Sequence, residues 1–152
     1  DVISTGTDIT DNYFIAAQGS DIAYVNTTNH QPLSVVDLAT SGIATTHSLD
    51  YVDFNNAKYL AVINVTSGVA GNAFLYNVTD PLLLSTLPTS ADYAKVLAFK
   101  TPVLSSPSNG NLTGDVALKV SKDGYKMVMY ALTTNGSIAA YEFDCIDLAS
   151  IN

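Results

Sequence analysis

Short apolar runs, separated by turn-forming residues, fill most of the chain. The clearest series lies in the middle, where Tyr, Leu, Val, Ile and Phe dominate each run, as is typical of β-strands. Four runs follow one another here, at residues 47–54, 58–65, 73–78 and 82–87. The first two are joined through Asn55 and Asn56, which favour a tight turn. The pattern predicts a four-stranded antiparallel meander over residues 47–87.

Two similar units flank this meander. Residues 13–38 and 115–152 repeat the order of strand, turn, strand, polar loop and strand. A tyrosine stands in the third strand of each unit, at Tyr24, Tyr76 and Tyr141. These three are either packing residues between neighbouring sheets or aromatic ligand contacts, and the sequence leaves both readings open.

The remaining segments connect or extend the three units. Residues 1–12 predict a tail or an edge strand, and 1–10 could add as a strand to a neighbouring copy. Residues 88–114 predict an irregular connection with one strand at 95–99, and loops of this length often form contact surfaces. A 3.6-residue apolar period is hard to find, so helix content should be small.

These patterns predict a single all-β domain over residues 1–152, made of three four-stranded antiparallel blade-like meanders. Units of about 40 to 50 residues have the period of β-propeller blades. A closed propeller has about four to eight blades. With three blades, this chain should not close a ring alone. Open faces and exposed strand edges would then be available for pairing with another chain.

Two segments resemble known propellers. Within 72–87, AFLYNVTDPLLLSTL resembles the third and fourth strands of blades in bacterial and archaeal surface propellers, where a strand ending in Asp-Pro leads to the outer strand. Residues 114–143, GDVALKVSKDGYKMVMYALTTNGSIAAYEF, resemble closing blades of secreted propeller proteins of the Bacteroidetes type. The likeness covers about two thirds of the chain. It implies a surface location and a binding role, and it supplies no catalytic residue.

The charge balance narrows the choice of partners. The chain carries a net charge of −8, only 13% of its residues are charged, and its six basic residues are all Lys. Without Arg it lacks the bidentate group that reads phosphates, which argues against nucleic acid as a partner. The same acidity disfavours anionic membrane surfaces. No run of about 18 apolar residues is present, so we expect no membrane span.

Several features suit an extracellular protein. A chain that starts at Asp1 fits removal of a signal or pro-segment, and equally an excised fragment. Cys145 has no internal partner, so it is either a small buried side chain or half of an intermolecular disulfide. Five Asn-X-Ser/Thr triplets are candidate glycosylation sites or turn residues, at Asn26, Asn64, Asn77, Asn111 and Asn135.

No residue pattern indicates catalysis, a cofactor or a metal. His30 and His47 lie at no zinc-ligand spacing from each other or from a Cys. Asp50 and Asp53 are three apart on an expected strand, so they should point to opposite faces. The acidic residues near position 10, Asp8 and Asp11 with Asn12, lack the full calcium-loop pattern.

The sequence therefore leaves two functional hypotheses. The first is a non-enzymatic, self-assembling extracellular subunit of a surface filament or appendage, whose partners are other copies of itself. The second is a carbohydrate- or protein-binding module that is a fragment of a larger secreted β-propeller. Glycans are a possible partner under the second hypothesis because nine Tyr could form aromatic platforms.

Overall fold

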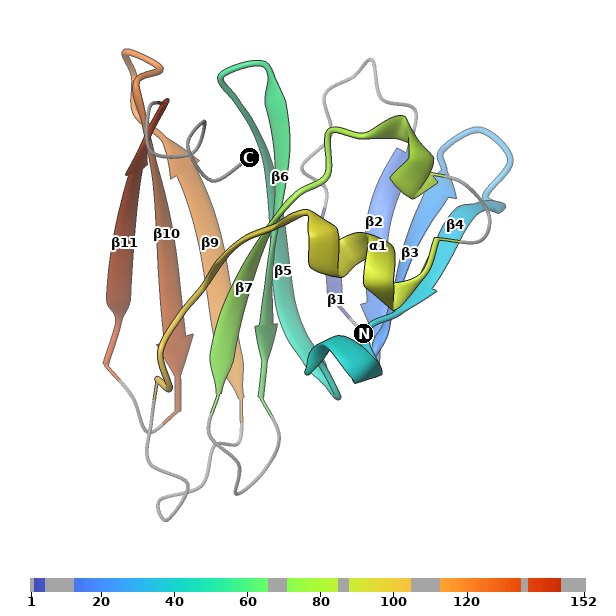
Figure 1. Cartoon of the computed structure of the whole chain (residues 1–152), viewed down its shortest axis with the longest axis horizontal. Helices are drawn as coiled ribbons and strands as arrows, with labels where there is room; N and C mark the ends of the chain where they lie inside the picture. The colour runs from blue at the N-terminus through green and yellow to red at the C-terminus, as the bar shows by residue number, and fades with distance from the viewer. Residues whose placement is uncertain are drawn as a thin grey trace.

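Three antiparallel sheets make up the described part of the chain, and helix is confined to short segments. The computed structural model describes residues 2–4 (backbone only), 13–65, 71–84, 88–104, 113–134 and 137–145. The all-β class and the low helix content expected from the sequence are confirmed. Figure 1 shows the third sheet at the left, the middle sheet in the centre and the first sheet at the right.

Each sheet is a meander, in which strands that follow one another in the chain are paired. The first sheet consists of β1 (Val2–Ser4), β2 (Tyr13–Gln18), β3 (Asp21–Asn26) and β4 (Pro32–Asp37). The middle sheet consists of β5 (Thr46–Phe54), β6 (Ala57–Asn64), β7 (Asn72–Asn77) and β8 (Leu97–Lys100). The third sheet consists of β9 (Gly114–Val120), β10 (Lys126–Thr133) and β11 (Ala139–Asp144).

Residues with left-handed backbone close the tight turns. Asn55 and Asn56 have φ angles of 51° and 60°, the pattern of a type I′ turn between β5 and β6. Gly19 has φ 59° in the turn between β2 and β3, and Gly124 has φ 78° between β9 and β10. The turn at Asn55 and Asn56 lies where the sequence predicts it.

The strand predicted at 82–87 is wrong. Pro81–Leu84 forms a 3-10 helix, η2, and residues 85–87 lie outside the described part. Asp80 starts this turn because its Oδ1 accepts a hydrogen bond from the Leu82 N–H at 2.9 Å and its carbonyl accepts one from the Leu83 N–H at 3.0 Å. These local bonds compete with strand pairing. The fourth strand of the middle sheet is β8 instead.

The segment 88–114 is more regular than predicted. It contains α1 (Ser90–Lys95) as well as β8, which overlaps the strand expected at 95–99 and begins two residues later. Thr89 and Asp92 form a capping box that starts α1. Hydrogen bonds from the Thr89 backbone and hydroxyl, and from Lys95, lower the pKa of Asp92 to about 2.

Two further expectations change at the ends of the chain. The third sheet has three described strands where four were expected, and the chain after residue 145 lies outside the described part. Val2–Ser4 is the edge strand β1, and it pairs with Ala17–Ile15 of its own β2. The described part of this segment therefore pairs within its own chain, and residues 5–10 lie outside the described part.

The sheets stack around two apolar layers. One layer lies between the first and middle sheets and includes Ile15, Ile22, Leu60, Val62 and Tyr93. The other lies between the middle and third sheets and includes Ala61, Ile63, Leu75, Met127 and Met129. Neighbouring residues of β6 thus belong to different layers, and the middle sheet is buried on both faces.

The first strands of the three sheets converge. β5 packs beside β1 on one side and beside β9 on the other. The approach of β9 to the end of β6 requires Gly114, because a Cβ there would lie 2.6 Å from Cγ2 of Val65. Farther out, α1 and η2 lie between the middle and first sheets (Figure 1). In the described residues the sheets do not close into a ring.

Replacing Ile63, which is fully buried between the middle and third sheets, by Ala should lower the free energy of unfolding by about 2–5 kcal/mol. Urea unfolding followed by circular dichroism measures this change. The exposed Lys119→Ala control on the third sheet should stay within about 0.5 kcal/mol of wild type. If Ile63→Ala lowers the free energy of unfolding by no more than the control does, the third sheet does not bury this face of the middle sheet.

Candidate functional site

The face of the third sheet that points away from the middle sheet carries apolar side chains toward one end and charged ones, Lys119, Lys126 and Glu142, toward the other. On β10, Met127, Met129 and Ala131 point inward and are at most 1% exposed. The alternating Val128, Tyr130 and Leu132 point outward because side chains of a strand alternate between faces. A solvated face normally carries polar residues at such positions.

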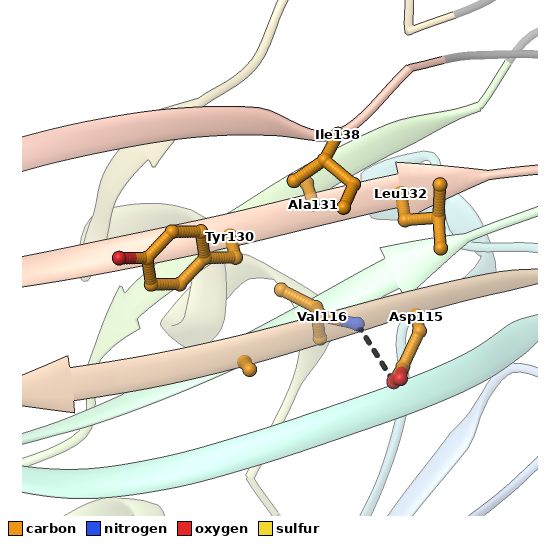
Figure 2. A pocket seen from close by; sticks show the side chains of 7 residues that line it. Asp115, Val116, Tyr130, Ala131, Leu132 and Ile138 are labelled. Carbon is orange, nitrogen blue, oxygen red and sulfur yellow. Dashed lines mark hydrogen bonds between the residues drawn. The ribbon is translucent and has the colours of Figure 1, made fainter.

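We call the apolar part of this outward surface the third-sheet open face and define it by Ala117, Val128, Tyr130, Leu132, Ile138 and Ala140. Tyr130 pairs directly with Ala117 on one side and with Ala140 on the other. Tyr130, Leu132 and Ile138 are 42%, 39% and 67% exposed. Figure 2 shows these three side chains around a shallow pocket of about 150 Å³. Exposed apolar side chains that cluster in this way are candidates for an interaction surface.

Asp115, at the rim of this pocket, is already engaged by other groups. Its Oδ1 accepts hydrogen bonds from the Val116 N–H at 2.9 Å (Figure 2) and from the Ser48 hydroxyl at 2.6 Å. Its carboxylate therefore ties β9 to β5. The rest of the pocket lining is aliphatic or aromatic, which suits a packing partner better than a reacting group.

The opposite end of the stack has a second apolar area on its outward face, next to the polar Gln18, Asp21 and Asp37. We call it the first-sheet open face and define it by Phe14, Ala16, Ala23, Val25 and Val35. These residues alternate with the buried ones that face the middle sheet. Val35 is 42% exposed and the other four are half-buried. Both ends of the stack thus present side chains of the type that fills its interior.

Asp50 links the middle and third sheets where their first strands meet. Its Oδ2 accepts a hydrogen bond from the Leu118 N–H of β9 at 2.7 Å, and its Oδ1 accepts one from the Tyr51 N–H at 2.9 Å. Asp53 instead forms a 3.2 Å ion pair with Lys58. Asp50 and Asp53 therefore have separate partners. The sequence analysis did not predict the hydrogen bond between Asp50 and β9.

The three marker tyrosines lie in the apolar layers. Tyr24 and Tyr76 are each 1% exposed between the first and middle sheets. Tyr141 is half-buried, with its ring 5.2 Å from that of Phe99 in the other layer. Burial raises the pKa of Tyr24 well above its usual value. All three are packing residues, and Tyr24 and Tyr76 are closed to a ligand.

The three described sequons differ in accessibility. Asn26 precedes an exposed loop, and its Oδ1 accepts from the Thr28 N–H at 2.7 Å. Asn77 has the same local geometry with the Thr79 N–H at 3.2 Å. Asn64 is only 9% exposed, and its Oδ1 accepts from the Thr45 N–H at 3.0 Å. Asn111 and Asn135 lie outside the described residues.

The remaining candidates form no cluster. His30 lies in the loop after β3 with φ 58°, and His47 lies within β5. Cys145 is half-buried, and its Sγ is 3.6 Å from the Tyr125 carbonyl oxygen. Among the described residues, no three His, Cys, Asp or Glu side chains lie together as metal ligands would. Asp8, Asp11 and Asn12 fall outside the described part.

The sequence was compared with protein families, curated proteins and solved structures. Residues 1–144 match the family described as "Domain of unknown function (DUF8500)". The chain belongs to the DUF8500 family. No curated protein and no solved structure matches it. The described helical segments of this DUF8500 chain fall short of the length that a bilayer crossing needs.

In this DUF8500 chain, Asp50→Ala should lower the free energy of unfolding by about 1–3 kcal/mol, because the Leu118 N–H loses its acceptor. Asp50→Asn keeps an acceptor oxygen and should cost less. Thermal and urea unfolding of the two variants provide the comparison. Equal stability of wild type and Asp50→Ala would show that this bond does not hold β5 against β9.

Proposed function

We propose that this DUF8500 chain is a non-enzymatic extracellular structural protein, which assembles with other copies of itself into a surface filament or appendage. The observation that carries the proposal is the exposure of Tyr130, Leu132 and Ile138 on a sheet whose other face is packed like a core. Burying a large apolar side chain contributes about 1.5–3 kcal/mol. Covering this face with another protein surface therefore provides a driving force for assembly.

The size of the face indicates how strong one contact is. Three strands about 4.8 Å apart and about seven residues long, at about 3.3 Å per residue, have a footprint of about 14 Å by 23 Å. This footprint is about 320 Å². In a protein–protein interface of standard size, each partner buries about 800 Å² of its surface. A single contact is weak, so stable assembly uses both open faces of each copy.

Composition supports the extracellular location. The chain is acidic and poor in charged residues, with 13% charged residues and a net charge of −8. The described carboxylates serve structural bonds: Asp50 and Asp115 tie strands together, and Asp92 caps α1. This engagement supports a structural role over acid–base catalysis.

A second candidate function is a carbohydrate- or protein-binding module within a larger secreted β-propeller. The convergence of β1, β5 and β9 favours it, because consecutive propeller blades stack with their first strands around one axis. In that arrangement, further sheets of the same polypeptide cover the two open faces. In both functions another sheet covers each open face. The sheet comes from a second copy in the first function and from the same polypeptide in the second.

Sedimentation of the purified chain tests the self-assembly proposal. The mass should rise above 16.0 kDa as the concentration increases, and Tyr130→Glu should weaken association by about tenfold or more because it places a charge in the interface. Tyr125→Glu is the matched control, since Tyr125 is 70% exposed in the turn before β10, outside the open face. A strictly monomeric wild type at high concentration would argue against the proposal.

The extracellular proposal extends to glycans at Asn26 and Asn77. Both side chains adjoin exposed residues and have the sequon threonine within hydrogen-bonding distance, whereas Asn64 is enclosed by the fold. In protein secreted from eukaryotic cells, Thr28→Ala should remove the mass of one glycan, and Thr66→Ala should leave the intact mass unchanged. An intact mass near 16.0 kDa for the wild type would rule out glycosylation.

A further inference from the structure

Four tyrosines form a polar cluster inside the apolar layer between the first and middle sheets. They are Tyr13 of β2, Tyr24 of β3, Tyr51 of β5 and Tyr93 of α1, and each is at most 5% exposed. All three of the others act on the ionisation of Tyr24, and after burial they raise its pKa further. Two sheets and a helix therefore contribute hydroxyl groups to one buried place.

Two of the four hydroxyls are paired with each other. Tyr13 Oη and Tyr51 Oη lie 2.9 Å apart in a buried hydrogen bond, which joins β2 to β5. The Tyr13 ring also meets the Tyr24 ring edge to face, with their centroids 5.4 Å apart. The paired hydroxyls thus belong to side chains that pack directly beside Tyr24.

The hydroxyls of Tyr24 and Tyr93 are buried and have no hydrogen-bond partner among the described residues. Both rings are held in place by edge-to-face contacts, and that of Tyr93 lies 5.5 Å from the ring of Tyr76. Burial raises the pKa of Tyr93 to about 12, so its hydroxyl keeps its proton at neutral pH. A buried donor without an acceptor destabilises the folded state, so these two groups need a partner.

We propose that this cluster is the binding site of one internal water molecule, which bridges the hydroxyls of Tyr24 and Tyr93. Buried waters in proteins make about two to four hydrogen bonds, typically to polar groups that would otherwise lack a partner. A water oxygen accepts from both hydroxyls, and each hydroxyl oxygen can accept in return. The bridge joins β3 of the first sheet to α1.

The chemistry of the cluster favours water over other ligands. Tyr24 and Tyr93 are 1% and 0% exposed, so only a very small molecule fits between them. The hydroxyls carry no charge at neutral pH, and an ion without an opposite charge is costly to bury. The site lies inside one copy of the chain, so this inference is independent of the proposed self-assembly.

A high-resolution crystal structure of the purified chain tests the site directly. We expect one ordered water whose oxygen lies within about 3.2 Å of both Tyr24 Oη and Tyr93 Oη. If the two Oη atoms instead hydrogen-bond to each other, or if both hydroxyls are dry, the inference is overturned. Neither of these results changes the self-assembly proposal.

Removal of one hydroxyl tests the site in solution. Tyr93→Phe keeps the packed ring and deletes one partner of the water, so the urea midpoint of unfolding should fall. A midpoint that stays the same or rises would mean that the hydroxyl has no partner in the native protein, and it would overturn the inference. Tyr125→Phe is the matched control, since Tyr125 is 70% exposed and its midpoint should not change.

The double variant shows whether the two hydroxyls share one water. Tyr24→Phe and Tyr93→Phe each break the same bridge, so their combined midpoint shift should be smaller than the sum of the two single shifts. Shifts that add fully would place the hydroxyls in separate interactions and overturn the inference. Circular dichroism confirms that each variant is folded.

Discussion

Burial of the middle sheet on both of its faces is the interaction on which the rest of the structure depends. Leu60, Ala61, Val62 and Ile63 follow one another in β6 and are all fully buried, alternately against the first and the third sheet. An antiparallel sheet on the surface of a protein would expose every second one of these residues. The apolar layers on both sides therefore hold the other two sheets in place, while Asp50 and Gly114 determine how closely the third sheet approaches.

The same arrangement explains why the ends of the stack are unusual. The first and third sheets each use one face to cover the middle sheet, and a sheet that ended the structure would carry polar residues on the other face. The outward positions of β10 instead include Val128, Tyr130 and Leu132, with the charged Lys119 and Glu142 on either side of Val128. An apolar outer face costs solubility unless another surface covers it. Assembly between copies and closure within a longer polypeptide are two solutions to this one physical problem.

Much of the fold could be predicted from local patterns. The turn at Asn55 and Asn56 depends only on neighbouring residues, and its prediction is confirmed. The strand predicted over Leu82–Leu84 was wrong because apolar composition does not reveal that Asp80 and Pro81 favour a 3-10 turn. The bond from Leu118 to Asp50 joins residues 68 apart, so only the folded chain shows it.

The candidate site was harder to predict than the strands. The sequence drew attention to the tyrosines Tyr24, Tyr76 and Tyr141, which pack in the interior, and to residues 88–114 as a contact surface. A better signal was present in β10, where apolar residues occupy inward and outward positions alike. Such a run indicates burial on both faces, as in β6, but the sequence cannot show that one of those faces is uncovered until the order of the sheets is known.

Electron cryomicroscopy of the native assembly would test the central claim most directly, because it shows what covers the outer faces of the stack. The account predicts density for another sheet against Tyr130 and Leu132, continuing the layered order of the three sheets. Particles of a single chain, with both outer faces in contact with solvent alone, would contradict it.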